Sequence, residues 1–280
     1  MNILITTALT PNYILNTELK LMQKSRDIYS PNIDILLHTP ELTNNDFEFP
    51  YDTRCGYEMK SLDYDADFLS KYDWVVRCDC DVLFLQDLYE SLDGFDKSKD
   101  MFLVPENRRF LGGNDHRLMK KLSNVSEFEH IDIEPMDYTI KSLEDNENMY
   151  PIFQCGIQII NGKVFNRFNL FMEWNYLNYI VEKYYGTFHS LELAWSILIQ
   201  KLHLDIEIID DSFNWNPISH WRDGKFPEQK LKDICILPED IKMFHYHKQY
   251  WLKYFINDKR IKKIIESIDI DNDFWDSKPY

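Results

Sequence analysis

Two aspartates that directly follow an apolar run are the residues most suited to chemistry in this sequence. Asp79 and Asp81 come after Trp74-Val75-Val76 and stand two positions apart, so on an extended chain their carboxylates point to one side. Two adjacent carboxylates repel each other, and a bound divalent cation removes that repulsion. Carboxylate oxygens suit Mg²⁺ or Mn²⁺, which usually keep ligand positions for substrate phosphates. The pattern therefore predicts a metal site at the end of a strand.

The same aspartate pair is also common in solvated turns of acidic chains. Here an apolar run follows the pair as well as precedes it, because Val82-Leu83-Phe84-Leu85 comes directly after Asp81. Apolar flanks on both sides favour a functional site over a surface turn. Arg77 shares the strand parity of the aspartates, so we expect it either to face the same cleft or to form a structural ion pair.

Two histidines late in the chain are further candidate metal ligands. His245 and His247 alternate around Tyr246, so both side chains can lie on one face. A neutral imidazole coordinates divalent ions, and the neighbouring Lys248 can place a point charge near phosphates. Taken alone, such histidines are more often satisfied surface or core residues, and a lone lysine is usually a solvated charge.

The segments that must position these residues alternate between strand and helix patterns. Apolar runs predict strands at 3–8, 33–37, from 74 into Asp79 and Asp81, 101–104, 153–160 and 206–209. Helical spacing predicts helices over 15–28, ending near 68–72, over 165–181 and over 191–198. Such alternation is typical of an α/β fold with a mostly parallel central sheet flanked by helices, whose strands open at their carboxyl ends onto a ligand crevice.

The chain has no 20–50-residue repeat, so one domain spanning 1–280 is expected, and solenoids and propellers are excluded. The polar stretch 112–150 is predicted to be an insertion or a lid loop. A C-terminal amphipathic helix is predicted at about 250–268. We expect this helix to dock on the core with its basic face in solvent. Weak peripheral contact of the basic face with an anionic membrane is a further hypothesis. The basic residues are Lys253, Lys259, Arg260, Lys262 and Lys263.

Composition excludes several classes of protein. The 280 residues carry 47 acidic and 31 basic side chains, a formal charge of −16, which argues against a nucleic-acid partner. No apolar run reaches the roughly 20 residues of a membrane span, and the N-terminus lacks a basic leader, so a cytoplasmic protein is expected. The five cysteines are then reduced, and Cys78-Asp79-Cys80 has no second cysteine pair to complete a zinc site.

Five segments resemble, in order, motifs of the GT-A glycosyltransferases, most closely family 8. The stretch 73–88 is similar to that family's D-x-D strand, and Thr10-Pro11-Asn12-Tyr13 is similar to its nucleotide-contacting segment. Phe153–Asn161 resembles the F-N-A-G strand beside the donor sugar. Phe213-Asn214-Trp215-Asn216 resembles the late W-N, and Phe244-His245-Tyr246-His247 with Trp251 resembles the closing H-F-x-G and W. Together these segments span residues 1 to about 255.

The resemblance implies a GT-A fold, a nucleotide-sugar donor that is most often UDP-linked, and a Mn²⁺ or Mg²⁺ ion on Asp79, Asp81 and His245. It implies donor contacts from Ala8, Thr10, Asn12, Tyr13, Arg77, Asp79, Cys80, Asp81, Gly156 and Lys248. Gln154 and Glu192 are the implied catalytic positions. Three of these positions have a structural alternative: Tyr13 as a packed loop aromatic, Gln154 as a cap of a buried backbone group and Glu192 as an exposed helix carboxylate. Gln154-Cys155 replaces the family's Asn-Ala, and Lys248 replaces its closing Gly.

The implied function is transfer of a hexose from a nucleotide diphosphate to an acceptor hydroxyl on a glycan, a lipid-linked molecule or a protein. Haloacid-dehalogenase-type phosphohydrolases also carry D-x-D after an apolar strand, but they need Thr or Val where Leu83 stands. Nucleotidyltransferases need a Gly-Ser dipeptide upstream, and none precedes Asp79. A non-catalytic sugar-binding homologue is the remaining alternative, against which the intact Asp79, Asp81 and His245 count.

Overall fold

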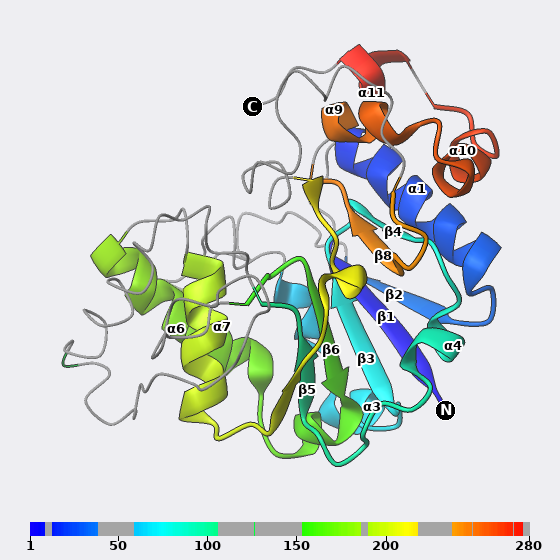
Figure 1. Ribbon diagram of the computed structural model, residues 1–280. Helices are drawn as coiled ribbons and strands as arrows, with labels where there is room; N and C mark the ends of the chain where they lie inside the picture. Colours follow the sequence, from blue (N-terminus) through cyan, green and yellow to red (C-terminus); the bar gives the residue numbers. More distant parts are fainter. Residues whose placement is uncertain are drawn as a thin grey trace, which may run out of the picture.

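The computed structural model describes residues 1–8, 13–38, 59–105, 126, 153–185, 190–217, 237–247, 249–270 and 272–276. Within these residues the chain forms one six-stranded sheet, one two-stranded sheet and the helices that cover them (Figure 1). The predicted lid loop at 112–150 lies outside the described residues, apart from Ser126.

The main sheet has the strand order β2-β1-β3-β6-β5-β7. Its members are β1 (Ile3–Ala8), β2 (Asp34–His38), β3 (Trp74–Cys78), β5 (Met101–Leu103), β6 (Ile157–Asn161) and β7 (Ile206–Ile208). β6 runs antiparallel to its neighbours β3 and β5, whereas the other pairings, β1 with β2, β1 with β3 and β5 with β7, are parallel. The predicted mostly parallel α/β sheet is therefore confirmed.

Strand residues alternate between two cores on the two faces of this sheet. Leu4 and Val75 face a core that includes Trp174 and Trp195, from the helices α6 (Leu170–Tyr185) and α7 (Ser190–Lys201). Ile5 and other central-strand residues face the opposite core, which α1 (Tyr13–Tyr29), α4 (Leu88–Leu92) and β4 (Val82–Phe84) complete. Because β1 and β3 are buried on both faces, their sequences are continuous apolar runs, which made them easy to predict.

Shorter helices complete the layers of the main sheet. They are the α-helix α3 (Ala66–Leu69) and the 3₁₀ helices η1 (Lys60–Leu62), η3 (Gly162–Asn166) and η5 (Asp211–Phe213). The helix predicted to close at 68–72 ends at Leu69, and the strand predicted at 153–160 begins only at Ile157. Phe153 instead forms an isolated bridge with Pro105.

A second, smaller sheet pairs β4 antiparallel with β8 (Met243–His245), and it lies between the main sheet and the C-terminal helices, beside α1 (Figure 1). Its outer side packs on a third core, built largely from late-chain residues such as Trp215, Phe255 and Phe274. The helices of this region are α9 (Gln249–Leu252), η6 (Lys253–Phe255), α10 (Lys259–Ile265) and α11 (Asn272–Asp276).

The single helix predicted at about 250–268 is wrong: the segment is divided into α9, η6 and α10. Asp258 breaks it, because its backbone is extended (φ −61°, ψ 126°) and its carboxylate accepts a hydrogen bond from the N–H of Arg260 as the N-cap of α10. Ile261 and Ile264 of the predicted isoleucine stripe are nevertheless buried. No helix among the described residues combines the length and the hydropathy needed to cross a membrane.

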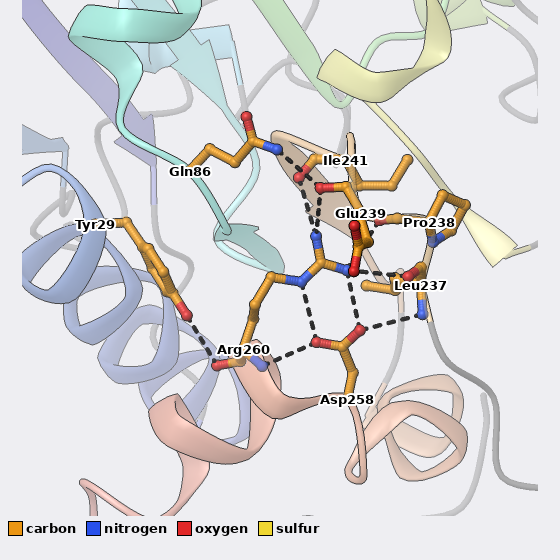
Figure 2. A network of polar contacts seen from close by, with 8 residues as sticks. All are labelled: Tyr29, Gln86, Leu237, Pro238, Glu239, Ile241, Asp258 and Arg260. Carbon is orange, nitrogen blue, oxygen red and sulfur yellow. Dashed lines mark hydrogen bonds and ion pairs between the residues drawn. The ribbon is translucent and has the colours of Figure 1, made fainter.

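One arginine joins α10 to the segment that leads into β8 (Figure 2). The Arg260 guanidinium donates to Asp258 and to the backbone carbonyls of Leu237, Pro238 and Glu239 at 2.9–3.2 Å. Asp258 in turn accepts from the N–H of Leu237 at 3.2 Å. α10 is thereby fixed to the backbone just before β8, the strand that carries His245.

Candidate metal centre

The turn between β3 and β4 carries both aspartates. β3 ends at Cys78 and β4 begins at Val82, so Asp79-Cys80-Asp81 crosses from the main sheet to the small sheet instead of continuing the strand as predicted. The Asp79 N–H donates to the Gly156 carbonyl at 3.0 Å, and the Asp81 carbonyl accepts from the Tyr246 N–H at 3.2 Å. The turn is therefore held on one side by the approach to β6 and on the other by β8.

His245 is brought to the aspartates by the pairing of β4 with β8. It stands opposite Val82 in the register, and its N–H donates to the Trp215 carbonyl at 2.9 Å. Its imidazole Nε2 lies 3.2 Å from Asp81 Oδ1 and 3.7 Å from Asp79 Oδ2. The three residues that the sequence assigned to a metal ion thus converge, although about 165 positions separate the aspartates from the histidine.

Gly156 makes room for that imidazole. A Cβ atom at position 156 would stand 2.2 Å from both Cε1 and Nδ1 of His245, far inside contact distance. The ring is therefore packed directly on the backbone of residue 156, with its Nε2 edge toward the aspartates. This close approach gives Gly156 a positional role in the site, which any side chain would disrupt.

Arg77 forms the ion pair that the sequence left open as an alternative to a free cleft position. Its Nη2 lies 2.6 Å from Asp79 Oδ1, and its Nη1 donates to the Cys155 carbonyl and, at 3.3 Å, to Gln158 Oε1. The side chain is 2% exposed. Arg77 thus fixes the Asp79 carboxylate and, through its hydrogen bond to the Cys155 carbonyl, links it to the segment before β6.

The charges of the centre perturb one another strongly. Burial alone would lower the pKa of His245, but the carboxylates of Asp81 and Asp79 outweigh it and raise that pKa above its ordinary value. Burial would raise the pKa of Asp81, yet the attraction of His245 holds it below the ordinary value. At Asp79 burial prevails over Arg77 and His245, and the pKa is raised.

These residues fit a divalent cation. Asp81 Oδ1 is shielded from solvent and accepts no well-formed hydrogen bond, although it faces the His245 imidazole, whereas Asp79 Oδ1 is paired with Arg77. One ligand atom each from Asp81, His245 and His247 lies within 4.8 Å of the others. Carboxylate oxygens with imidazole nitrogens form a donor set that suits Mn²⁺ and related ions.

Comparisons with solved structures identify the fold of the chain. No protein-family model and no curated protein sequence matches the chain. Among solved structures, an active-site mutant of LgtC superposes with a TM-score of 0.56 at 16% identity, covering 98% of this chain and 99% of that one. The galactosyltransferase LgtC in complex with donor and acceptor sugar analogues gives a TM-score of 0.52 at 15% identity, covering 97% of both chains. The chain has the GT-A fold.

A third solved structure supports this fold. The glycosyltransferase GlyE from Streptococcus pneumoniae TIGR4 matches with a TM-score of 0.51 at 13% identity, covering 95% of this chain and 62% of that one. The resemblance to GT-A proteins that the sequence motifs predicted is therefore confirmed at the level of the fold. The haloacid-dehalogenase alternative, which requires a different fold, is thereby set aside.

The predicted donor contacts divide by position in this GT-A fold. Ala8 is buried at the carboxyl end of β1, at the edge of the sheet where the parallel strand β3 also ends. Tyr13 begins α1, and its side chain is outside the described part of the chain, as are Thr10, Asn12 and Lys248. Cys80 is buried, and its Sγ lies 3.8 Å from Glu18 Oε2 on α1. Contact of these residues with a nucleotide stays a prediction.

The two predicted catalytic positions lie just beyond the metal centre. Gln154 is 5% exposed; its Oε1 accepts from Asn216 Nδ2 at 2.9 Å and its Nε2 donates to the Pro105 carbonyl at 3.4 Å. Glu192, in the first turn of α7, has its Oε1 at 3.5 Å from Cys155 Sγ. Since the Cys155 carbonyl also accepts from Arg77, the two positions adjoin the residues that fix Asp79. Their catalytic roles stay predictions.

Two buried polar residues of the centre were not found from the sequence. Gln158 stands opposite Arg77 in the β3–β6 register and is 0% exposed. Glu18 is 4% exposed, and burial together with the charges of Asp81 and Asp79 raises its pKa well above the ordinary value. The signal for Glu18 was its place on the apolar stripe of its helix, one turn before Met22 and two before Ser25, both of which are buried.

Proposed function

We propose that the protein is a metal-dependent glycosyltransferase. It moves a hexose from a nucleotide-diphosphate sugar, with UDP as the expected nucleotide, to a hydroxyl of a glycan, a lipid-linked molecule or a protein. The observation that carries the proposal is the convergence of Asp79, Asp81 and His245 at the carboxyl end of β3 in a GT-A fold. The LgtC structure with donor and acceptor sugar analogues supports the substrate class.

Asp79, Asp81 and His245 would hold the Mn²⁺ or Mg²⁺ ion. When bound, the ion would supply positive charge beside the diphosphate, where negative charge grows as the bond between sugar and phosphate breaks. The net charge of −16 makes such a local cation important, because the protein as a whole repels a diphosphate.

The chain's own residues preorganise the site before any donor arrives. Arg77 holds the Asp79 carboxylate, the β4–β8 register places His245 opposite Val82, and Gly156 lets the imidazole approach the backbone closely. Groups fixed in this way need no reorganisation when the substrate binds, which is how a rigid framework contributes to catalysis.

Gln154 and Glu192 are proposed to serve the sugar. Gln154 is held by Asn216 and Pro105, so its amide has a fixed orientation beside the segment that leads to Gly156. Glu192 is partly exposed and lies beside the Cys155 side chain, and its carboxylate can accept a hydrogen bond from a sugar hydroxyl. We propose Gln154 as a donor-sugar contact and Glu192 as the carboxylate nearest to the transferred sugar.

The test is turnover of a panel of nucleotide sugars with a hydroxyl acceptor or water, with and without Mn²⁺. The wild-type protein should release nucleotide diphosphate only with the metal. Asp81→Ala should abolish that release while retaining the wild-type circular dichroism spectrum. Asp93→Asn removes an exposed carboxylate at the end of α4 and is the matched control, expected to keep full activity.

Two outcomes would contradict the assignment. Full turnover in Asp81→Ala would show that the aspartate pair has no part in the reaction. Metal-dependent binding of a nucleotide sugar by the wild type without any release of nucleotide diphosphate would instead support the non-catalytic sugar-binding alternative.

A further inference from the structure

His247 lies directly against the metal centre, although the proposed ligand set does not include it. Its ring centroid is 3.8 Å from that of His245, with an angle of 31° between the ring planes. A ligand atom of His247 lies within 4.8 Å of those of Asp81 and His245. The structure therefore brings the side chains of Asp81, His245 and His247 together.

The backbone of His247 adopts a conformation that few residues adopt. Its φ is +59°, in the left-handed region, where a non-glycine residue is uncommon and histidine is among the better tolerated types. Positions of this kind cluster at ligand-binding sites, where the surrounding structure maintains them against a small strain. Here the turn directly after β8 redirects residue 247, and its imidazole comes to rest on the ring of His245.

Asp79 is less available to a cation than the histidine is. Its Oδ1 is already paired with Arg77 at 2.6 Å, and its Oδ2 is 3.7 Å from His245 Nε2, compared with 3.2 Å for Asp81 Oδ1. Among the described residues, the ligand atoms that all lie within 4.8 Å of one another come from one carboxylate and two imidazoles, and Asp79 stands beside this group.

We propose that His247 is a second imidazole ligand of the metal ion, and that this makes the centre select nitrogen-binding transition metals over Mg²⁺. The inference rests on the proposed metal site and deepens it. Mg²⁺ demands oxygen ligands and sheds its water reluctantly, whereas imidazole suits cobalt, zinc and nickel. Along the first-row series, affinity for such a nitrogen-containing site rises from Mn²⁺ to Co²⁺ and beyond.

The test is calorimetric titration of the full-length protein with Co²⁺ and with Mg²⁺, together with the visible absorption spectrum of the Co²⁺ form. The wild type should bind Co²⁺ at least about 100-fold more tightly than Mg²⁺. His247→Asn retains tolerance of the left-handed backbone and offers a harder oxygen. It should lose at least about tenfold in Co²⁺ affinity, a loss typical of a disrupted metal site, and change the Co²⁺ spectrum, while Mg²⁺ affinity stays within about threefold.

Two further variants separate ligation from backbone strain. His247→Gly removes both the imidazole and the strain, so it should lose Co²⁺ affinity like the asparagine variant without losing thermal stability. His203→Asn is the matched control: His203 also has a positive φ, +48°, but it is exposed at the end of α7. It should leave Co²⁺ binding unchanged.

The proposal and the glycosyltransferase assignment can fail separately. Wild-type Co²⁺ affinity and an unchanged spectrum in His247→Asn would overturn the role of His247 even if nucleotide-sugar turnover is retained. Absence of turnover in a wild type that binds Co²⁺ through His247 would overturn the enzymatic assignment alone. Equal affinity of the wild type for Mg²⁺ and Co²⁺ would overturn the proposed selectivity.

Discussion

Gly156→Ala tests whether the approach of His245 to the backbone of residue 156 sets the metal centre. The added Cβ would stand 2.2 Å from two ring atoms of His245, whereas ordinary contact begins at 3.4 Å, so the ring must retreat by about 1.2 Å (3.4 − 2.2). Misplacing a positioned group by about 1 Å commonly costs on the order of 100-fold in rate. We expect metal-dependent turnover to fall about 100-fold and the free energy of unfolding to fall by about 1–3 kcal/mol through overpacking.

The assays are Mn²⁺ titration calorimetry, nucleotide-sugar turnover and urea denaturation. Gly162→Ala is the matched control, because its Cβ would stand 2.1 Å from the Tyr72 carbonyl, equally close but away from the centre. It should lose stability without a specific loss of Mn²⁺ affinity. In a His245→Ala background, the overlap disappears, so Gly156→Ala should then have little effect on stability. Unchanged Mn²⁺ affinity in Gly156→Ala, or the same loss of stability in both backgrounds, would refute the reasoning.

Two further predictions concern the C-terminal region that supports β8. Arg260→Lys should lower the free energy of unfolding, measured by urea denaturation, by about 2 kcal/mol, because one ammonium cannot replace a guanidinium that bonds Asp258 and several carbonyls. The control is Lys262→Ala on the same helix. It breaks only an exposed ion pair with Glu266 and should change the free energy of unfolding by less than about 0.5 kcal/mol. Burial raises the pKa of Asp258, but hydrogen bonds from Arg260 and Leu237 outweigh it and hold that pKa below its ordinary value. The carboxylate therefore stabilises the fold fully above about pH 3.9, its unfolded pKa, and this contribution is lost as the pH falls further. Denaturation midpoints measured across the acid range should fall less steeply in Asp258→Asn, and an identical acid dependence would contradict this.

The centre of the main sheet was predictable because strands such as β1 and β3 are buried on both faces and therefore have continuous apolar sequences. β1 has the bounds that the apolar run indicated, and β5 and β7 each end one residue earlier than predicted, whereas β3 ends at Cys78 and does not run into the two aspartates. The long helices α1, α6 and α7 followed from helical spacing. The convergence of the candidate ligands was also accessible, because the aspartate pair and the late histidine are chemically distinctive and resembled known motifs in order; their binding of a metal stays a prediction.

Other features depend on contacts between residues distant in sequence. The aspartates lie in a turn between two sheets, because β4 pairs with β8, more than 150 positions later, and not with the main sheet. The partners of Arg77 come from the segment around residues 155–158, which no local pattern reveals. The C-terminal segment kept its helical spacing but not its continuity, because the Asp258 cap starts a new helix at Lys259. Packing of the Gly156 backbone on His245 was equally hidden, since it requires the fold.

Metal-dependent binding of a nucleotide diphosphate tests the central claim most directly. The measurement is a thermal-shift series of the wild type and Asp81→Ala with UDP and the other nucleotide diphosphates, with and without Mn²⁺. The account predicts that the wild type is stabilised by UDP and Mn²⁺ together, more than by the sum of their separate effects, and that Asp81→Ala loses this joint stabilisation. Stabilisation by UDP that is independent of Mn²⁺, or that is equal in Asp81→Ala, would contradict it.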